Sequence, residues 1–133
     1  MVVPSTAGEC KGLLKTAIRD NDPVMFFEHK MLYTTKFNDV PEVEEDVCIP
    51  FGRARIVAEG ADITVVTNSM MTIKAEKAVR QLQKEGISAE LIDLRTIVPL
   101  DTETIVRSVK KTGKLLIVDE GHLSFGITGE IAS

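Results

Sequence analysis

Residues 89–120 read AELIDLRTIVPLDTETIVRSVKKTGKLLIVDE and contain two apolar runs on either side of an amphipathic segment. The runs at 89–94 and 114–120 have the length and aliphatic content of buried strands. Asp101 or Thr102 can cap a helix between them, and its apolar residues are Ile105, Val106 and Val109. Gly113 follows where a left-handed residue is favoured. The stretch therefore predicts strand, crossover helix and strand, the unit from which parallel sheets are built.

The same alternation extends in both directions. Upstream, RARIVAEG (53–60) is predicted as a strand, and DITVVTN (62–68) is a β-branched run suited to a strand buried on both faces. Asn68 or Ser69 can cap the next helix and Gly86 can end it; its buried stripe comprises Ile73, Ala75, Ala78, Val79 and Leu82. Downstream, residues 121–133 predict a third helix. This order predicts an α/β domain with a mostly parallel sheet between two helical layers.

The first fifty residues follow a different pattern. Residues 5–20 predict a helix capped by Ser5 or Thr6, with an apolar stripe of Leu13, Leu14, Ala17 and Ile18. The turn-forming DNDP ends it, and VMFF (24–27) predicts a short buried strand. Residues 34–50 contain an acidic cluster and two prolines, and they show no periodicity. Because so long a loop is unusual inside a compact domain, they predict a connecting arm between residues 1–33 and a domain at 51–133.

Charge and cysteine content narrow the class of protein. A net charge of −4, with KK at 110–111 as the longest basic run, argues against nucleic acid as the partner. The apolar runs are too short to span a bilayer, and the N-terminus lacks the features of a signal peptide. Cys10 and Cys48 fit no metal-ligand spacing, so we expect two free thiols in a cytosolic protein.

Four residues are candidates for chemistry, each with a plainer structural role. Arg95 and His122 follow predicted strands, where ligands of open α/β sheets bind. Arg95 could meet an anion, or it could pair with Asp93, Asp101 or a partner subunit. Asp101 is explained as a helix cap worth about 1 kcal/mol. His29 and His122 have no second ligand at metal spacing and are interpreted as polar residues of surface loops or contacts.

The glycines at 121, 126 and 129 do not form a phosphate-binding motif. They are expected to let the last helix begin close to the sheet. Because that helix has no strand after it, we also expect the chain to be a fragment of a longer one. Residues and spacing alone thus describe an α/β fragment with an unidentified partner.

Four longer stretches carry a resemblance to a known family. AIRDNDPVMFFEHKMLY, IPFGRARIVAEGADITVVT, AELIDLRTIVPLDTETIVRSVKKTGKLLIVDEGH and FGITGEIAS together resemble the β subunit of the E1 component of 2-oxo-acid dehydrogenase complexes. That group includes pyruvate, branched-chain and acetoin dehydrogenases that use thiamine diphosphate. The resemblance implies that residues 1–33 end a pyrimidine-binding domain and that 34–50 form the linker arm. It further implies that 51–133 belong to a transketolase-type C-terminal domain that lacks its final strands.

The resemblance also implies where the chemistry lies. In the family, thiamine diphosphate and magnesium are held between an E1 α and a β subunit, and the catalytic glutamate and histidine of β lie upstream of the part matched here. His29 and His122 do not match that histidine, so no catalytic or cofactor-binding residue is assigned, and the isolated chain is expected to be inactive. Many members bind potassium beside the segment matched by AIRDNDP, which implies a metal site at Ala17, Ile18, Asp20 and Asp22.

The implied partners are E1 α, a second E1 β and the E2 lipoyl acyltransferase, without nucleic acid or membrane. The implied location is the cytoplasm, or the mitochondrial matrix in a eukaryote. HKMLY and EGHLSFG favour a pyruvate or acetoin substrate. Two alternatives stay open: a non-catalytic assembly module, and an unrelated small α/β nucleotide-binding domain.

Overall fold

The central element is a four-stranded sheet with the order β1-β3-β2-β4. The structure is a computed structural model, and it describes residues 1–34, 47–122 and 124–133. The strands are β1 (Arg55–Ala58), β2 (Ile63–Thr67), β3 (Ala89–Asp93) and β4 (Leu115–Val118). Strand β2 runs parallel to both β3 and β4, whereas β1 is antiparallel to β3, with an irregularity between Ile56 and Ala58. The predicted mostly parallel sheet is therefore confirmed.

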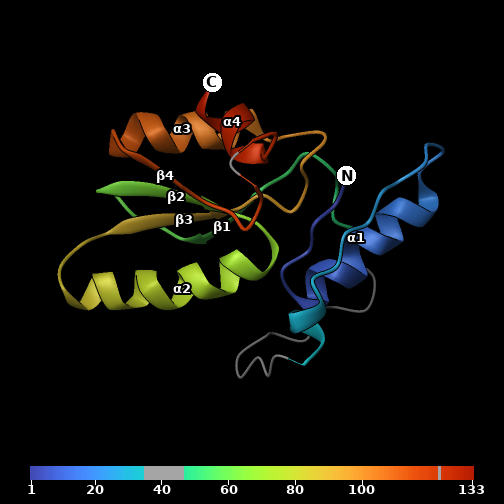
Figure 1. Cartoon of the computed structure of the whole chain (residues 1–133), viewed down its shortest axis with the longest axis horizontal. Coiled ribbons are helices and arrows are strands. Elements are labelled where there is room, and N and C mark those ends of the chain that lie inside the picture. The colour runs from blue at the N-terminus through green and yellow to red at the C-terminus, as the bar shows by residue number, and fades with distance from the viewer. Residues whose placement is uncertain (35–46, 123) are drawn as a thin grey trace.

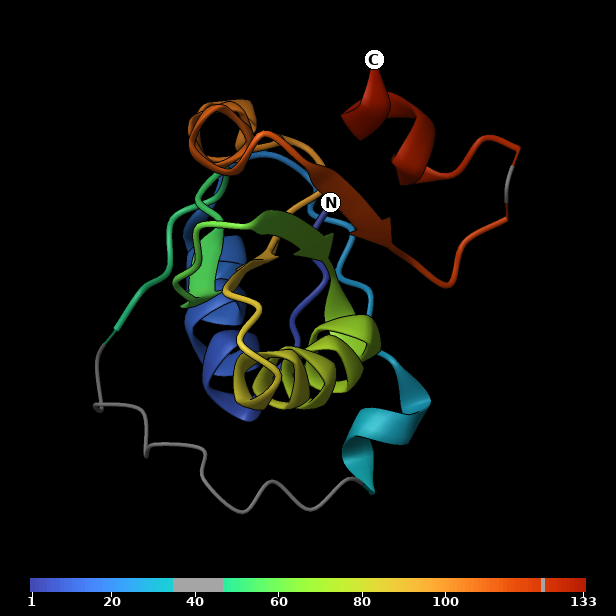
Figure 2. The ribbon, with the colours of Figure 1, turned by 90° about the vertical axis from the view of Figure 1, so that its left-hand side faces the viewer.

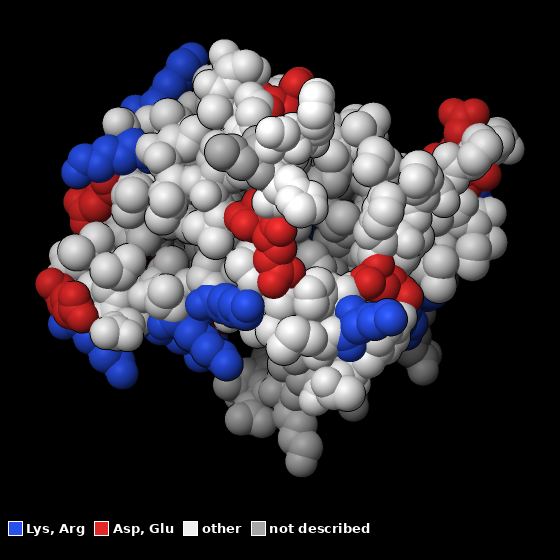
Figure 3. Space-filling model, viewed as in Figure 1, with Lys and Arg blue, Asp and Glu red and all other residues white. Residues whose placement is uncertain are grey.

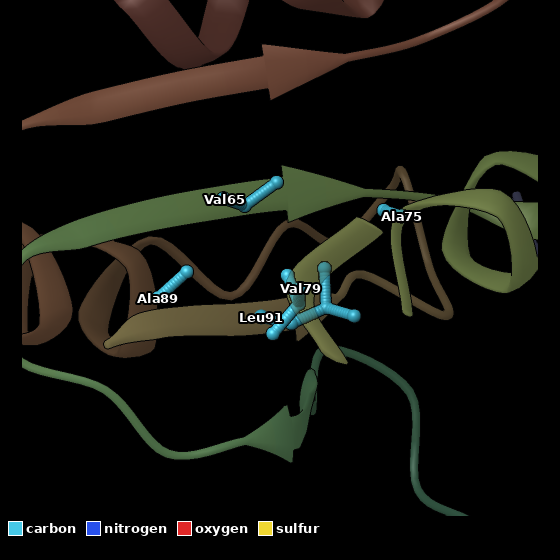
Figure 4. Close-up of a cluster of buried hydrophobic side chains, with 5 residues drawn as sticks. All are labelled: Val65, Ala75, Val79, Ala89 and Leu91. Carbon is cyan, nitrogen blue, oxygen red and sulfur yellow. The ribbon is translucent and has the colours of Figure 1, made fainter. Parts of the chain in front are cut away.

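Helices cover both faces of this sheet (Figures 1 and 2). Helix α2 (Ser69–Lys84) lies on one face, and α3 (Thr102–Thr112) and α4 (Ile127–Ala132) lie on the other. On the α2 side, Ala75 and Val79 pack against strand residues Val65, Ala89 and Leu91 (Figure 4). On the opposite face, a second cluster contains Val66, Ile92, Leu94 and Ile105, with Ile127 and Ile131 of α4 against it. The three-layer α/β architecture predicted from the sequence is confirmed.

Glycine placement fixes the ends of these elements. Gly86 and Gly113, after α2 and α3, have φ of +84° and +71°, as predicted for left-handed residues. Gly60, before β2, has a different role, since a Cβ atom there would lie 2.2 Å from backbone atoms of Ala89 and Glu90. Only glycine allows the turn at 60 to approach β3 so closely.

The predicted helix stripes are partly wrong. Ala78 of α2 and Val106 of α3 are exposed, whereas Thr104 and Ser108 of α3 are buried. The reason is that the buried face of α3 consists of residues 104, 105 and 108, so that hydroxyls occupy two of its three positions. The hydroxyl of Thr64 lies 2.7 Å from those of both Ser108 and Thr112. A polar contact thus joins β2 to α3 where the pattern predicted an apolar one.

The N-terminal segment contains helix α1 (Ala7–Arg19), and the hydroxyl of Thr6 accepts the N–H of Glu9 as its cap. Leu13 is fully buried against Val2 and Ile49. Leu14 and Ile18 are exposed, contrary to the prediction, because α1 packs through Gly8, Glu9, Gly12 and Leu13. The two glycines in that set allow close approach, and a Cβ at Gly12 would lie 2.7 Å from the Ile49 side chain.

The predicted buried strand at 24–27 is wrong. Phe26 forms a single parallel bridge with Val2, and Met25 and Phe27 are 58% and 43% exposed. One bridge does not form a ladder, and among the described residues no strand pairs further with this segment. A 3-10 helix, η1 (Lys30–Tyr33), follows. The predicted arm at 34–50 falls mostly on residues 35–46, which lie outside the described residues.

No helix in the described part of the chain is long and apolar enough to cross a membrane. Both cysteines, Cys10 and Cys48, are free thiols as predicted.

Candidate functional site

A cleft of about 840 Å³ lies at the carboxyl ends of the parallel strands. It is lined by residues that follow β2 and β4, by the N-terminal segment and by the start of α4. This is the place where the sequence analysis expected a ligand in an open α/β sheet. The lining residues are Met1, Val3, Phe27, Glu28, His29, Asn68, Ser69, Ile97, Asp119, Glu120, Gly121, Phe125, Gly126, Ile127, Gly129 and Glu130.

The pairing of β2 with β4 brings Asn68 and Asp119 together. The Asn68 side-chain amide donates to Asp119 Oδ1 at 3.1 Å, and Asn68 makes no side-chain cap bond to α2 although it occupies the cap position. Ser69 begins α2 with a positive φ of 47°. The sequence predicted Asn68 or Ser69 as the helix cap; Asn68 occupies that position, but its amide joins two strand ends. Only the register of β2 and β4 reveals this contact.

His29 and Glu120 also meet in the cleft. Nε2 of His29 lies 2.9 Å from Glu120 Oε2, and Nδ1 accepts the backbone N–H of Met31 at 3.2 Å. Lys74 Nζ lies 3.7 Å from the other oxygen of Glu120. His29 thus holds the N-terminal segment against the loop after β4. His122, the other candidate, is exposed, and the structure does not bring it to His29.

The lining of the cleft is acidic. Glu28, Asp119, Glu120 and Glu130 all contribute, and acidic side chains gather near the centre of the face in Figure 3, between α4 and α2. Hydrogen bonds from Tyr33 and then Cys10 lower the pKa of Glu28. No continuous basic surface appears on this face (Figure 3). An acidic, partly apolar cleft repels phosphate and suits a cationic or amide-bearing group.

Asp101 is a helix cap, as predicted. Its Oδ1 accepts the N–H of Thr104 at 3.1 Å, and its Oδ2 accepts the Thr104 hydroxyl at 2.8 Å and the N–H of Ala54 at 2.9 Å. Burial alone raises the pKa of Asp101, but the hydrogen bonds from Ala54 and Thr104 outweigh it and lower the pKa. Asp101 therefore ties the segment before β1 to α3 and does not face the cleft lining.

Arg95 has a partner that the sequence did not indicate. Its Nε donates to Glu9 Oε1 at 2.8 Å, and only its backbone N–H reaches Asp93, at 3.4 Å from Oδ1. It has a left-handed φ of 60°, which no motif predicted. Pairing with Asp101, one of the alternatives left open by the sequence, is not among its contacts within the described residues. The structural interpretation of Arg95 holds, but with α1 as its partner.

Glu9 and Asp93 are a pair of buried carboxylates that the sequence analysis missed. Their exposed fractions are 3% and 0%. Burial and the neighbouring Glu9 raise the pKa of Asp93 to about 7. Two features of the sequence could have indicated them: Glu9 lies on the same face of a predicted helix as two glycines, and Asp93 ends an otherwise apolar strand.

The four residues assigned to potassium lie together at the end of α1. The Ala17 carbonyl accepts the N–H of Asp20 at 3.3 Å, and Asp20 Oδ1 accepts the N–H of Asp22 at 2.9 Å. Ile18, Asp20 and Asp22 are exposed. The geometry is an Asx-type turn after a helix C-terminus. Within the described residues, no group of three or more His, Cys, Asp or Glu side chains could hold a metal ion.

Residues 52–133 match "Transketolase, C-terminal domain", and the chain belongs to that family. Over its whole length it is 45% identical to the pyruvate dehydrogenase E1 component subunit beta of Bacillus subtilis, covering 40% of that protein. It is 48% identical to the acetoin:2,6-dichlorophenolindophenol oxidoreductase subunit beta of Cupriavidus necator, covering 38% of it.

A solved structure titled "Split gene transketolase, inactive beta4 tetramer" has a TM-score of 0.82 and 30% identity, covering 98% of this chain and 42% of that one. The transketolase-type fold expected from the sequence is confirmed. The chain spans about two fifths of the length of the curated relatives described above, at 40% and 38%.

The residues of the cleft do not fit thiamine diphosphate. A diphosphate needs backbone N–H groups or cations, and here four carboxylates line the space. Lys74, which approaches the cleft through Glu120, is already engaged with that carboxylate. We therefore derive no catalytic step through this cofactor from the residues of this chain.

Proposed function

We propose that the chain is part of the β subunit of the E1 component of a pyruvate-type 2-oxo-acid or acetoin dehydrogenase complex. The intact E1 would use thiamine diphosphate and magnesium to decarboxylate or cleave its substrate and to transfer the acyl group to lipoyl-E2. This segment would carry contacts to E1 α, to a second E1 β and to E2. The observation that carries the proposal is collinear identity of 45 to 48% over the whole chain with two such subunits.

The domain boundaries within the chain are part of the same proposal. Residues 1–33 would end the pyrimidine-binding domain, 34–50 would connect, and 51–133 would form the C-terminal domain. The match at 52–133 supports the last boundary. Burial of Val2, Ser5 and Glu9, with hydrogen bonds from Ser5 to Thr72 and from Arg95 to Glu9, supports a contact between the first segment and the domain at 51–133. The cytoplasm, or the mitochondrial matrix in a eukaryote, would be the site of action.

A chimaera tests this assignment. The matching segment of the Bacillus subtilis E1 β subunit would be replaced by these 133 residues and co-expressed with its E1 α. We expect an assembled E1 that consumes pyruvate when thiamine diphosphate, magnesium and lipoyl-E2 are supplied. The unmodified subunit and a chimaera carrying Arg80→Glu, in an exposed pair with Glu76, serve as controls. Folded chimaera that does not bind E1 α would argue against the proposal.

The assembly-module alternative differs in one result. A module would let the chimaera assemble and bind E2 without restoring turnover. The nucleotide-binding alternative predicts saturable binding of a nucleotide by the purified chain, which the acidic cleft disfavours.

A potassium ion at Ala17, Ile18, Asp20 and Asp22 remains part of the proposal. Carbonyls at a helix C-terminus and a carboxylate suit a hard cation. We expect potassium, and not sodium at equal ionic strength, to raise the melting temperature of the chain. Asp20→Asn should reduce that rise, while Asp62→Asn, at an exposed turn, should not. Equal effects of the two salts would remove the site from the proposal.

A further inference from the structure

One buried carboxylate fastens α1 to the sheet. Glu9 Oε1 accepts from Arg95 Nε at 2.8 Å and lies 2.8 Å from Arg55 Nε, while Oε2 accepts the N–H of Ser5 at 3.1 Å. Arg55 belongs to β1, and Arg95 follows β3. Glu9 is thus the point at which the helix meets two sheet elements through opposite charges. A hydroxyl chain continues the contact, from Ser5 Oγ to Thr72 Oγ1 at 3.1 Å.

Asp93 adjoins this ion pair and shares the guanidinium of Arg55 with it. It is fully buried: Arg55 Nη2 lies 3.4 Å from Oδ2, the backbone nitrogen of Arg95 lies 3.4 Å from Oδ1, and the Ser5 side chain also hydrogen-bonds the carboxyl. The guanidinium groups make their shorter contacts, 2.8 Å, with Glu9. Ionising a carboxyl group that is buried from water is costly, and the neighbouring carboxylate of Glu9 adds repulsion.

We propose that Glu9, Arg55, Asp93 and Arg95 form a proton-dependent clamp, in which loss of a proton from Asp93 releases α1 from the sheet. With Asp93 protonated, the guanidinium groups of Arg55 and Arg95 pair with Glu9 alone, and α1 stays packed (seated) on the sheet. With Asp93 ionised, the two buried carboxylates of Glu9 and Asp93 compete for the guanidinium of Arg55, which lies within ion-pair distance of both. This inference concerns contacts inside the described residues and does not depend on the proposed E1 role.

The charges that face Asp93 come from three elements. Glu9 belongs to α1, Arg55 to β1, and Arg95 to the segment after β3, and the side chain of Ser5, just before α1, hydrogen-bonds Asp93. Burial and Glu9 raise the pKa of Asp93 to about 7, against the opposing effects of Ser5 and Arg55. The clamp would therefore respond close to neutral pH.

The sign of the response follows from proton linkage. The pKa of Asp93 is about 7 in the seated state, and it falls towards the ordinary 3.8 when release of α1 admits water and takes Glu9 away. Between these values the seated state holds one more proton, so the equilibrium constant for opening rises about tenfold per pH unit. Above about 7 both states are ionised and the dependence disappears. Seating of α1 is thus strongest in mild acid and weakens as the pH approaches neutrality.

Amide hydrogen exchange on the purified 133-residue chain, corrected for intrinsic rates, tests the clamp. Between about pH 5.5 and 7, protection of the α1 amides should fall about tenfold per unit, while the α3 amides change less. Asp93→Asn should abolish the dependence and keep wild-type protection at the acidic end. Glu76→Gln, in the exposed pair with Arg80, should leave the dependence intact.

Two further measurements test the clamp if Asp93→Asn does not fold. Carbon-detected NMR of the Asp93 carboxyl should give a midpoint near neutral pH, and Glu9→Gln should move that midpoint to lower pH. A midpoint below about 5, or pH-independent protection of α1 in the wild type, would overturn the clamp. Equal pH dependence in α1 and α3 would also overturn it, because it would indicate whole-domain unfolding.

Discussion

Asp101 is the residue whose replacement should most clearly separate a capping role from a catalytic one. Asp101→Ala removes three acceptor contacts: the N–H of Thr104, the hydroxyl of Thr104 and the N–H of Ala54. Loss of the cap costs about 1 kcal/mol, and a partly buried N–H left without an acceptor at Ala54 costs about 1–3 kcal/mol. We therefore expect a loss of about 2–4 kcal/mol in the free energy of unfolding.

Asp101→Asn refines the same prediction. The amide keeps one oxygen for Thr104 but turns its NH₂ group towards the N–H of Ala54, so about half of the loss should remain. Urea denaturation followed by circular dichroism at pH 7 measures both variants. A loss below about 0.5 kcal/mol for Asp101→Ala would refute the reasoning, since it would mean that water replaces all three contacts at no cost.

The pH dependence of Asp101 has a defined sign. Because its pKa is lower in the folded state than the ordinary 3.8, its ionised form stabilises the fold above that value. This stabilisation is lost as the pH falls below about 4 through the folded-state pKa. The difference in stability between wild type and Asp101→Asn should therefore narrow in acid, which is the opposite of the behaviour expected for Asp93.

Three further outcomes are expected. Leu13 is fully buried against Val2 and Ile49, so Leu13→Ala should lower the free energy of unfolding, measured in urea, by about 2–5 kcal/mol. The control, Leu14→Ala at an exposed position, should lower it by less than about 1 kcal/mol. Lys111 forms an ion pair with the buried carboxylate of Glu90, so Lys111→Met should lower the free energy of unfolding by about 1–3 kcal/mol. A free energy of unfolding equal to that of the wild type would show that the pair contributes nothing to stability. Burial, followed by Glu28, raises the pKa of Cys10 to about 11, so at pH 8 it should be alkylated roughly a hundredfold more slowly than a thiol of ordinary pKa. Mass spectrometry after a short iodoacetamide pulse should therefore find the label on exposed Cys48; equal labelling would show that Cys10 is not shielded in solution.

The alternation of strands and helices from residue 53 onward could be predicted because it depends on local signals. Apolar runs, caps at Asp101 and Thr6, and left-handed glycines at 86 and 113 act within a few residues of chain. The prediction was weaker where burial depends on a distant surface. Val106 and Ile18 are apolar at helical spacing yet exposed, because the faces of α3 and α1 that meet the sheet lie one or two positions away.

The candidate site was predicted only as a location. The rule for open α/β sheets placed it at the strand ends, and the cleft is there. Its contacts join residues separated by most of the chain, such as His29 with Glu120 and Asn68 with Asp119. No local pattern encodes such pairs, because they arise from the parallel register of β2 and β4 and from the seating of the N-terminal segment.

The sequence by itself determined the α/β class, the helix caps and the family to which residues 52–133 belong. These follow from short-range backbone preferences and from a collinear order of motifs. Tertiary structure alone decided that Arg95 meets Glu9, that Asp93 is buried beside them, and that the cleft is acidic. The physical reason is that charge pairing and desolvation depend on distances in space. Those distances are set by which faces pack together, and the chain order does not contain them.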